Sequence, residues 1–368
     1  MVHTWTSIIS TVFMLLLCIT GLPLIFHHEI DHVLGYAPDL RAPSPGAALL
    51  PVDTIAQNAL IHQPGKVLQY VSWDKDEPGQ VIAFTNAAPN APPNDAVVTA
   101  FNGFTGQPIG EVGGGPMRVV LQLHVDMYAG QPGKLFLGAM GILCLVAIVS
   151  GIVLYWPFTR RLKFGTVRTE SARRVGWLDL HNLLGITTIA WAVVVSGTGV
   201  INTWAEPMLE QWKSTELAAM AAPYAGSSAP KKLGSLDTLV ANATAAAPGM
   251  SVAFVAFPGT PFSSSHHYVA FMRGSSPLMS RLLKPVMLDG ETSTVTDVRE
   301  LPLYLKSLFV SQPLHFGDYG GMPLKIIWAL LDVVTIVVLA SGLYLWIVRR
   351  RKQSRAPRAA GQKEIGAA

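Results

Sequence analysis

The chain has 368 residues, of which half are hydrophobic and only 14% are charged, and its mean hydropathy is +0.37. This composition is too apolar for an ordinary soluble protein, yet its apolar residues are interrupted too often for a chain that lies entirely within a membrane. The formal net charge of +4 comes mostly from two short basic clusters, so it gives no reason to expect a nucleic-acid partner.

Four apolar stretches are long enough to cross a bilayer, whose hydrocarbon core of ~30 Å requires about 20 helical residues. We expect membrane-spanning helices over residues 5–26, 134–156, 178–204 and 323–348. The first stretch lacks a basic start and a small-residue cleavage site, so we interpret it as a retained helix and not as a signal peptide. Cys18 and Cys144 both fall within these stretches, where we interpret them as small apolar core residues.

The basic clusters predict the orientation of the helices. One lies in the loop 157–176, another begins the tail 349–368, and the first contains Arg160, Arg161, Lys163, Arg168, Arg173 and Arg174. Because positively charged loops stay on the cytoplasmic side, both termini are expected in the cytoplasm. The chain between the first and second spans, and between the third and fourth, is then expected outside.

Each outside segment predicts a small α+β domain, at residues 38–116 and 205–310. A helical pattern is followed by alternating strands with Gly-containing turns. We expect helices at 52–63 and 235–247, and strands at 67–73, 81–84, 96–101, 252–257, 267–272, 284–288 and 294–298. A histidine-bearing segment, 117–133 or 311–322, then leads into the next span.

The second half of the chain repeats the first. Counted from His124 and from His315, a Tyr, a Gly, a Pro, a Lys and a Ser-Gly pair occur at the same offsets. His3 and His181 are likewise both followed by Thr-Gly at the same spacing. Such a register indicates an internal duplication, with helix, α+β domain and helix occurring twice.

Four of the ten histidines obey this repeat. His3 pairs with His181 at the cytoplasmic ends of two spans, and His124 pairs with His315 at the outer ends of the other two. A pseudo-twofold axis along the membrane normal can place the members of each pair opposite one another. Two facing imidazoles favour a metal centre in a planar cofactor, since only two protein ligands are available.

Bis-histidine haem b fits this pattern, because it needs one imidazole on each side of the ring and apolar walls. The absence of Cys-x-x-Cys-His indicates that two haems would be bound non-covalently. A zinc or copper site and simple helix-end histidines are the alternatives; zinc usually needs four ligands, or three and a water. His28, near the outer end of the first span, is an alternative ligand, and Asp126, Asp179 and Asp318 are second-sphere partners or caps.

The histidine and glycine motifs together resemble the PepSY-associated transmembrane family, which includes inner-membrane ferric-siderophore reductases of the FoxB type. The resemblance covers nearly the whole chain and is carried by His3-Thr-Trp, Leu123-His124, Leu180-His181-Asn and Leu314-His315-Phe-Gly. It implies a four-helix membrane core with two haems, and two PepSY-like domains in the bacterial periplasm.

The resemblance also implies that electrons pass from a cytoplasmic donor to a periplasmic ferric siderophore. The lack of a Gly-x-Gly-x-x-Gly fingerprint predicts a separate donor, either a cytoplasmic reductant or quinol. Two other functions remain open: a PepSY-type binding or regulatory membrane protein without redox activity, and a siderophore or metal permease. The spans carry few charged residues, of which Asp332 is the main one, so they offer little for the translocation path of a permease.

Overall fold

The structure is a computed structural model that describes residues 2–36, 38, 40, 47–75, 77–159, 163–168, 170, 172–276 and 279–365. Arg160 and Arg161 of the predicted basic loop lie outside the described residues. The chain forms two compact units, each built from separate stretches of sequence. The helical unit comprises Met1–Phe26, Val119–Trp204 and Ser311–Ala368, and the sheet unit comprises His27–Arg118 and Ala205–Val310.

The helical unit contains the four expected spans. They are α1 (Val2–Ile25), α5 (Gly130–Thr159), α6 (Arg173–Thr203) and α11 (Gly321–Ile365), and each includes a segment long and apolar enough to cross a membrane. The prediction of four membrane helices is therefore confirmed. Helix α1 begins earlier than expected, so that His3 lies within regular helix, and His181 lies within α6 as expected.

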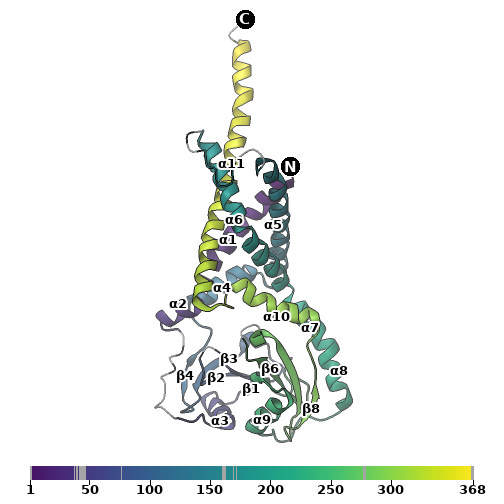
Figure 1. The fold of residues 1–368 in the computed structure, drawn as a ribbon. Helices are drawn as coiled ribbons and strands as arrows, with labels where there is room; N and C mark the ends of the chain where they lie inside the picture. The colour runs from purple at the N-terminus through teal and green to yellow at the C-terminus, as the bar shows by residue number, and fades with distance from the viewer. Residues whose placement is uncertain are drawn as a thin grey trace. The chain divides into compact units, whose positions relative to one another are not determined.

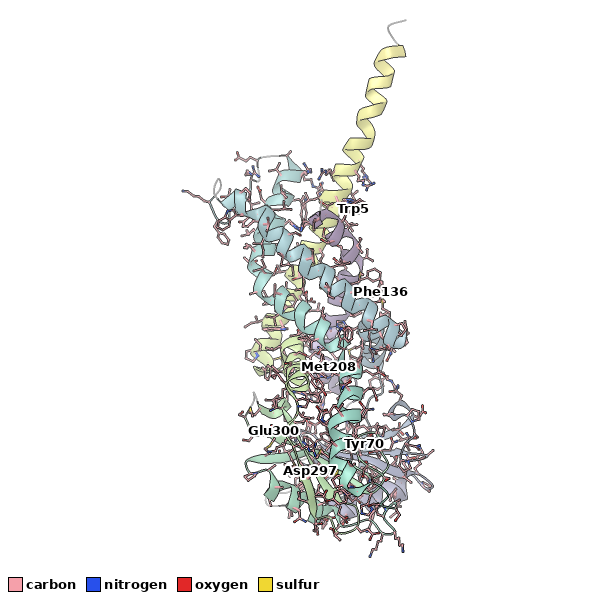
Figure 2. The ribbon with its side chains drawn as sticks, turned by 90° about the vertical axis from the view of Figure 1, so that its right-hand side faces the viewer. Trp5, Tyr70, Phe136, Met208, Asp297 and Glu300 are labelled. Atoms are coloured by element: carbon pink, nitrogen blue, oxygen red, sulfur yellow. The ribbon has the colours of Figure 1, made fainter. Side chains whose placement is uncertain are left out.

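The four long helices form a closed bundle (Figure 1). Helices α1 and α6 each pack against both α5 and α11. Phe13 of α1 meets Phe136 of α5 edge to face, with ring centroids 4.8 Å apart. Large apolar side chains such as Trp5 and Val153 remain exposed, and Figure 2 marks Trp5 and Phe136 on the bundle. A bundle with apolar residues on its outside as well as its inside suits a lipid environment.

A short helix precedes each of the two spans that follow the sheet segments. Helix α4 (Pro116–Asp126) carries His124, and α10 (Leu303–Phe316) carries His315. Both are followed by residues with positive φ, among them Gly130 and Gly321 at 61° and 59°. Glycine adopts this conformation without steric cost, so the chain can turn sharply before α5 and α11 begin.

The sheet unit holds one antiparallel sheet of eight strands, in the order β4-β3-β2-β1-β5-β6-β7-β8. The strands are β1 (Val67–Trp73), β2 (Gln80–Asn86), β3 (Val97–Asn102), β4 (Pro108–Glu111), β5 (Met250–Ala256), β6 (His267–Gly274), β7 (Leu283–Asp289) and β8 (Val295–Val298). The expectation of two separate α+β domains is not confirmed, because β1 pairs directly with β5 and joins both sets of strands. Strand β4 was missed, since Pro108 and Gly110 both disfavour strands.

Helices α3 (Val52–His62) and α9 (Leu236–Ala246) pack on the sheet, and their apolar sides share one core with it. Ile55 from α3 and Leu239 from α9 are almost fully buried there. The stretch 205–230, for which the sequence predicts no structure, contains α7 (Ala205–Trp212), a short π-helix at Lys213–Leu217 and α8 (Ala218–Ala221). Trp212 contacts Phe271 of the sheet, and Figure 2 labels Met208 of α7.

The remaining short elements join these parts. They are α2 (His27–Val33) and the 3₁₀ turns Pro93–Asp95, Ala222–Tyr224 and Met279–Arg281.

Helices α3 and α9 cap one another. Asp237 of α9 accepts hydrogen bonds from the backbone N–H groups of Val52 and Asp53, at 2.8 and 3.2 Å. In return Asp53 accepts the N–H of Leu236 at 2.8 Å and the hydroxyl of Ser235 at 2.6 Å. Each carboxylate thus accepts hydrogen bonds from N–H groups at the start of the other helix, which have no partner within that helix. The exchange ties the two halves of the unit together.

A second contact recurs in both halves. Asn58 of α3 donates its side-chain amide to the carbonyl of Gly106 at 2.9 Å, in the turn between β3 and β4. Asn242 of α9 donates to the carbonyl of Ser293 at 2.8 Å, in the turn between β7 and β8. These pairs, like Asp53 and Asp237, occupy matching positions of the sequence repeat.

Replacing Asp53 with Ala should lower the free energy of unfolding by about 1–2 kcal/mol, the usual cost of losing a helix cap. Burial alone would raise the pKa of Asp53, but hydrogen bonds from Ser235 and Leu236 outweigh it and lower this pKa. The contribution is therefore present above the unfolded value of about 4 and disappears as the pH falls below it.

The measurement is thermal unfolding of the detergent-purified protein at pH 7 and at acidic pH, with Asp95→Ala as the matched control. The Asp95 side chain makes no hydrogen bond or ion pair among the described contacts. Equal losses in the two variants would contradict the role assigned to the exchanged caps.

Candidate functional site

His124 and His315 face each other within the helical unit. Their ring centroids are 6.2 Å apart, and the ring planes are inclined at 60°. Burial, followed by the neighbouring His315, lowers the pKa of His124 to about 4, so this ring is neutral at pH 7. The structure thus brings together one of the two histidine pairs predicted from the sequence repeat.

Each of these rings is held at its Nδ1 atom by a neighbouring span. His124 is bonded to the hydroxyl of Thr20 at 2.9 Å and to the backbone carbonyl of Leu17, both on α1. His315 lies against α6, where it reaches the carbonyl of Val195 at 3.0 Å and the hydroxyl of Thr198 at 3.3 Å. Matching positions of α1 and α6 in the sequence repeat therefore offer the same pair of oxygens.

The second pair of histidines has matching surroundings. Nδ1 of His3 reaches the carbonyl of Ala147 at 2.9 Å and the hydroxyl of Ser150 at 3.3 Å, on α5. Nδ1 of His181 lies 3.0 Å from both the carbonyl of Val338 and the hydroxyl of Ser341, on α11. His3 also lies close enough to His181 for the two rings to interact electrostatically.

These contacts determine which ring nitrogen carries the proton. A carbonyl can only accept a hydrogen bond, so Nδ1 must be the donor. The hydroxyls agree, because each donates its own proton to its helix: Thr20 to Leu16 at 2.7 Å, and Ser341 to Val338 at 2.8 Å. With Nδ1 protonated in a neutral ring, the lone pair of Nε2 is available to bind a metal.

A glycine follows each of the four hydroxyl residues and makes room for the imidazole. A Cβ added to Gly199 would lie 3.1 Å from Cε1 of His315, and one added to Gly21 would lie 3.2 Å from Cε1 of His124. The same addition at Gly151 or Gly342 would come within 3.3 Å of His3 or His181. Each histidine therefore packs with its Nδ1–Cε1 edge close to a Ser-Gly or Thr-Gly step of another helix.

Sequence reasoning noticed these steps only as markers of the repeat and gave them no contact with the histidines. The sequence signal for this role is a hydroxyl residue followed by glycine within an otherwise apolar helix. Both residue types lower the stability of a helix interior, so their presence there indicates a specific contact.

The geometry of the His124–His315 pair fits a single metal bound between two rings. A metal–nitrogen bond of about 2.0 Å, plus about 1.1 Å from nitrogen to ring centre, places two opposed imidazoles about 6 Å apart centre to centre. The observed 6.2 Å agrees. Among the described residues there is no group of three or more His, Cys, Asp or Glu side chains suited to a metal. Two imidazoles are fewer than the three or four protein ligands that zinc usually requires.

Two of the aspartates expected near the histidines have other partners. Asp126 accepts hydrogen bonds from the amide of Gln122 and the backbone of Tyr128, and so caps the end of α4. Asp179 pairs with Arg168, whose guanidinium reaches it at 2.8 and 2.9 Å. Both therefore serve as a cap or loop anchor and not as a partner of an imidazole.

His28 remains a prediction as an alternative ligand. It lies in α2 of the sheet unit, where its ring meets that of His32 with centroids 6.0 Å apart.

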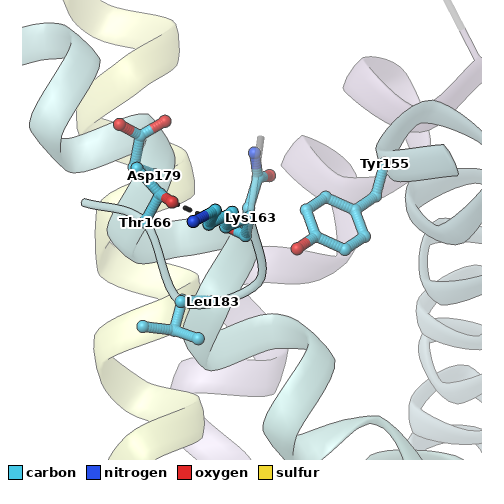
Figure 3. A pocket seen from close by; sticks show the side chains of 7 residues that line it. Tyr155, Lys163, Thr166, Asp179 and Leu183 are labelled. Atoms are coloured by element: carbon cyan, nitrogen blue, oxygen red, sulfur yellow. Dashed lines mark hydrogen bonds between the residues drawn. The ribbon is translucent and has the colours of Figure 1, made fainter. Parts of the chain in front are cut away.

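A small pocket lies beside Asp179 and is also lined by Asn182 and Leu183, the two residues that follow His181 in α6. Figure 3 shows Lys163, Thr166 and Asp179 grouped together, with the hydroxyl of Tyr155 directed toward them. Its cavity of about 20 Å³ is about the size of a single water molecule and is too small for a planar cofactor. The pocket therefore belongs to the loop anchor formed by Arg168 and Asp179.

Comparison with known proteins places the chain in a family. Residues 1–349 match the family described as the PepSY-associated TM region, and the chain belongs to that family. An uncharacterized protein of Pseudomonas aeruginosa is 24% identical over 256 residues, which cover 64% of this chain and 64% of that protein. The match thus spans less than two thirds of the relative, and its name assigns no activity.

Replacing Gly199 with Val should destabilise the helical unit, because the new side chain would push against His315. The expected cost is about 1–3 kcal/mol, the range for overpacking a well-packed position. Gly197→Val, on the same helix, is the control, since a Cβ there meets nothing within 4 Å. Thermal unfolding in detergent compares the two, and equal stabilities would show that His315 does not need the glycine.

Proposed function

We propose that this protein is a di-haem membrane reductase that carries electrons across the bacterial inner membrane to a periplasmic ferric siderophore. The facing pair of His124 and His315, with both Nε2 atoms available, is the observation that carries the proposal. One non-covalent haem b would be held by His124 and His315, and a second by His3 and His181. When bound, each haem supplies reversible one-electron chemistry.

Two centres suit the thickness of the membrane. On α1, His3 and Thr20 are seventeen residues apart, or about 26 Å along a helix. His3 belongs to one histidine pair, and Thr20 supports His124 of the other, so the pairs lie near opposite ends of the bundle. One centre alone would leave most of the ~30 Å hydrocarbon core uncrossed.

The described residues account for how such ligands would be held. The bond from Nδ1–H to a backbone carbonyl orients the ring and makes Nε2 a stronger ligand. The glycine beside each ring lets the neighbouring helix come close to the imidazole. These contacts need no covalent attachment, in keeping with the lack of a Cys-x-x-Cys-His motif.

The reaction with substrate requires only electron delivery. Ferric iron binds tightly to the hard oxygen ligands of a siderophore, and reduction to the softer Fe²⁺ weakens that hold. The electron would come from a cytoplasmic reductant or from quinol. The basic residues of the loop and of α11 favour cytoplasmic termini, which would leave the sheet unit in the periplasm.

We also propose that the chain arose by internal duplication. The exchanged caps, the Asn58 and Asn242 contacts and the four histidine environments all support this, since each joins residues at matching positions of the repeat.

The purified protein should show low-spin b-type haem spectra with two haems per chain. His315→Ala should lose one haem, because His124 alone would hold it only weakly, and His3→Ala should lose the other. His62→Ala, an exposed histidine on α3, should keep both. A haem-to-protein ratio from the pyridine haemochrome assay decides the matter. A haem-free wild-type protein, purified after growth with haem precursor, would instead favour the binding or regulatory function.

The dithionite-reduced protein, freed of excess reductant under anaerobic conditions, should be reoxidised by a ferric hydroxamate siderophore. Stopped-flow spectra would follow the haem while a ferrous chelator traps the released Fe²⁺. The gallium(III) complex of the same siderophore is the control, because it has the same shape and charge but cannot accept an electron. Reoxidation by both complexes, or by neither, would contradict siderophore reduction.

A further inference from the structure

A layer of polar side chains crosses the interior of the helical bundle. Each of the four spans contributes one of them: Cys18 from α1, Cys144 from α5, Ser196 from α6 and Asp332 from α11. The thiol of Cys18 donates a hydrogen bond to the carboxyl group of Asp332. Ser196 donates to the sulfur of Cys144 at 3.7 Å. The cysteines are thus polar partners across helices, and not the purely apolar core residues that the sequence suggested.

Asp332 is the group in this layer that calls for an explanation. Its side chain is only 5% exposed, and its Oδ2 atom has no hydrogen-bond partner among the described residues. No described salt bridge involves it. A buried carboxyl group without a cationic partner is costly within a membrane, and such groups usually serve proton or ion chemistry.

The layer lies between the two histidine pairs. On α1, Cys18 comes fifteen residues after His3 and two before Thr20, which supports His124. On α6, Ser196 comes fifteen residues after His181 and two before Thr198, which supports His315. At about 1.5 Å per residue the layer is displaced from the His124–His315 supports by roughly 3 Å along these helices, and by about 22 Å from the other histidines.

We propose that Asp332 is a proton-accepting residue coupled to electron transfer at the His124–His315 centre. This inference rests on the proposed function. Asp332 takes up one proton from the aqueous phase when that centre gains one electron from the donor, and releases the proton when the electron passes on to the ferric substrate. No net charge then accumulates in the low-dielectric interior.

Electrostatics gives the direction of this coupling. A ferric centre with two neutral imidazoles has one more positive charge than a ferrous centre, so it favours the ionised carboxylate nearby. Loss of that charge on reduction leaves the carboxylate unpaired in a low-dielectric interior, and protonation relieves the penalty.

Two thiols are the titratable side chains near Asp332 in this layer. Cys18 of α1 is hydrogen-bonded to Asp332, and Cys144 of α5 interacts electrostatically with Cys18. From α6 the layer contributes Ser196, which does not titrate. The two imidazoles of the His124–His315 pair carry their protons on Nδ1 in bonds to helix carbonyls, and are not available for this exchange.

Spectroscopic redox titration of the haem-loaded protein across a range of pH tests the proposal. In the wild type, the midpoint potential of the haem that is lost in His315→Ala should fall as the pH rises. In Asp332→Asn this dependence should be lost, while both haems and the thermal stability are retained. Asp332→Glu should keep a pH-dependent potential, and provides a second measurement if the Asn variant does not fold.

Ser196→Ala, a change in the same layer that removes no acid, should keep the wild-type pH dependence. A wild-type protein with two haems and a pH-independent potential would overturn the role of Asp332 alone. So would an Asn variant whose potential still follows the pH as in the wild type. A protein without haem would overturn the proposed function itself, so the two failures can be told apart.

Discussion

The helical unit depends on one repeated interaction, the hydrogen bond from an imidazole Nδ1–H to a carbonyl of a neighbouring helix. This carbonyl already belongs to a regular helix, so it can accept a second bond only if the ring comes very close to the backbone. The adjacent glycine allows that approach, and the adjacent hydroxyl oxygen provides a second acceptor for the Nδ1–H group. The four histidines thereby fix the relative rotation of neighbouring helices, while the Nε2 atom of each remains available as a metal ligand. Packing of the spans and preparation of the candidate ligands are consequently achieved by the same contacts.

In the sheet unit, the corresponding constraint is the exchange of Asp53 and Asp237 between two helix N-termini. Helix α3 begins after Pro51 with no side-chain cap of its own. Helix α9 has Ser235 as its N-cap, which accepts the N–H of Thr238, while the N–H of Leu236 is satisfied by Asp53. The exchange and the pairing of β1 with β5 lie at the centre of the unit, so the two halves share a boundary that contains both polar and backbone hydrogen bonds. This explains why strands that read as two domains in the sequence form a single core.

Much of the architecture could be predicted from the sequence, because apolar length and residue register are local properties. The four spans and most strands follow from such patterns, and the register of the repeat selected His3, His124, His181 and His315. The continuous sheet could not be predicted, since the pairing of Tyr70 with Ala256 depends on residues far apart in the chain. The support of His124 by Thr20, and the bond between Cys18 and Asp332, likewise depend on which helix faces which. The partners of Asp126 and Asp179 were left open by the sequence and are resolved only by their contacts.

The interleaving of the two units has a consequence for biosynthesis. Strand β1 emerges early from the ribosome, but its neighbour β5 follows about 180 residues later, after two further spans have been made. During that interval β1 is the edge of a half-finished sheet, with unpaired backbone groups that invite association with other chains. Contacts so distant in sequence also form slowly. The central pairing of the sheet, between β1 and β5, can therefore form only after the first two thirds of the chain have been made.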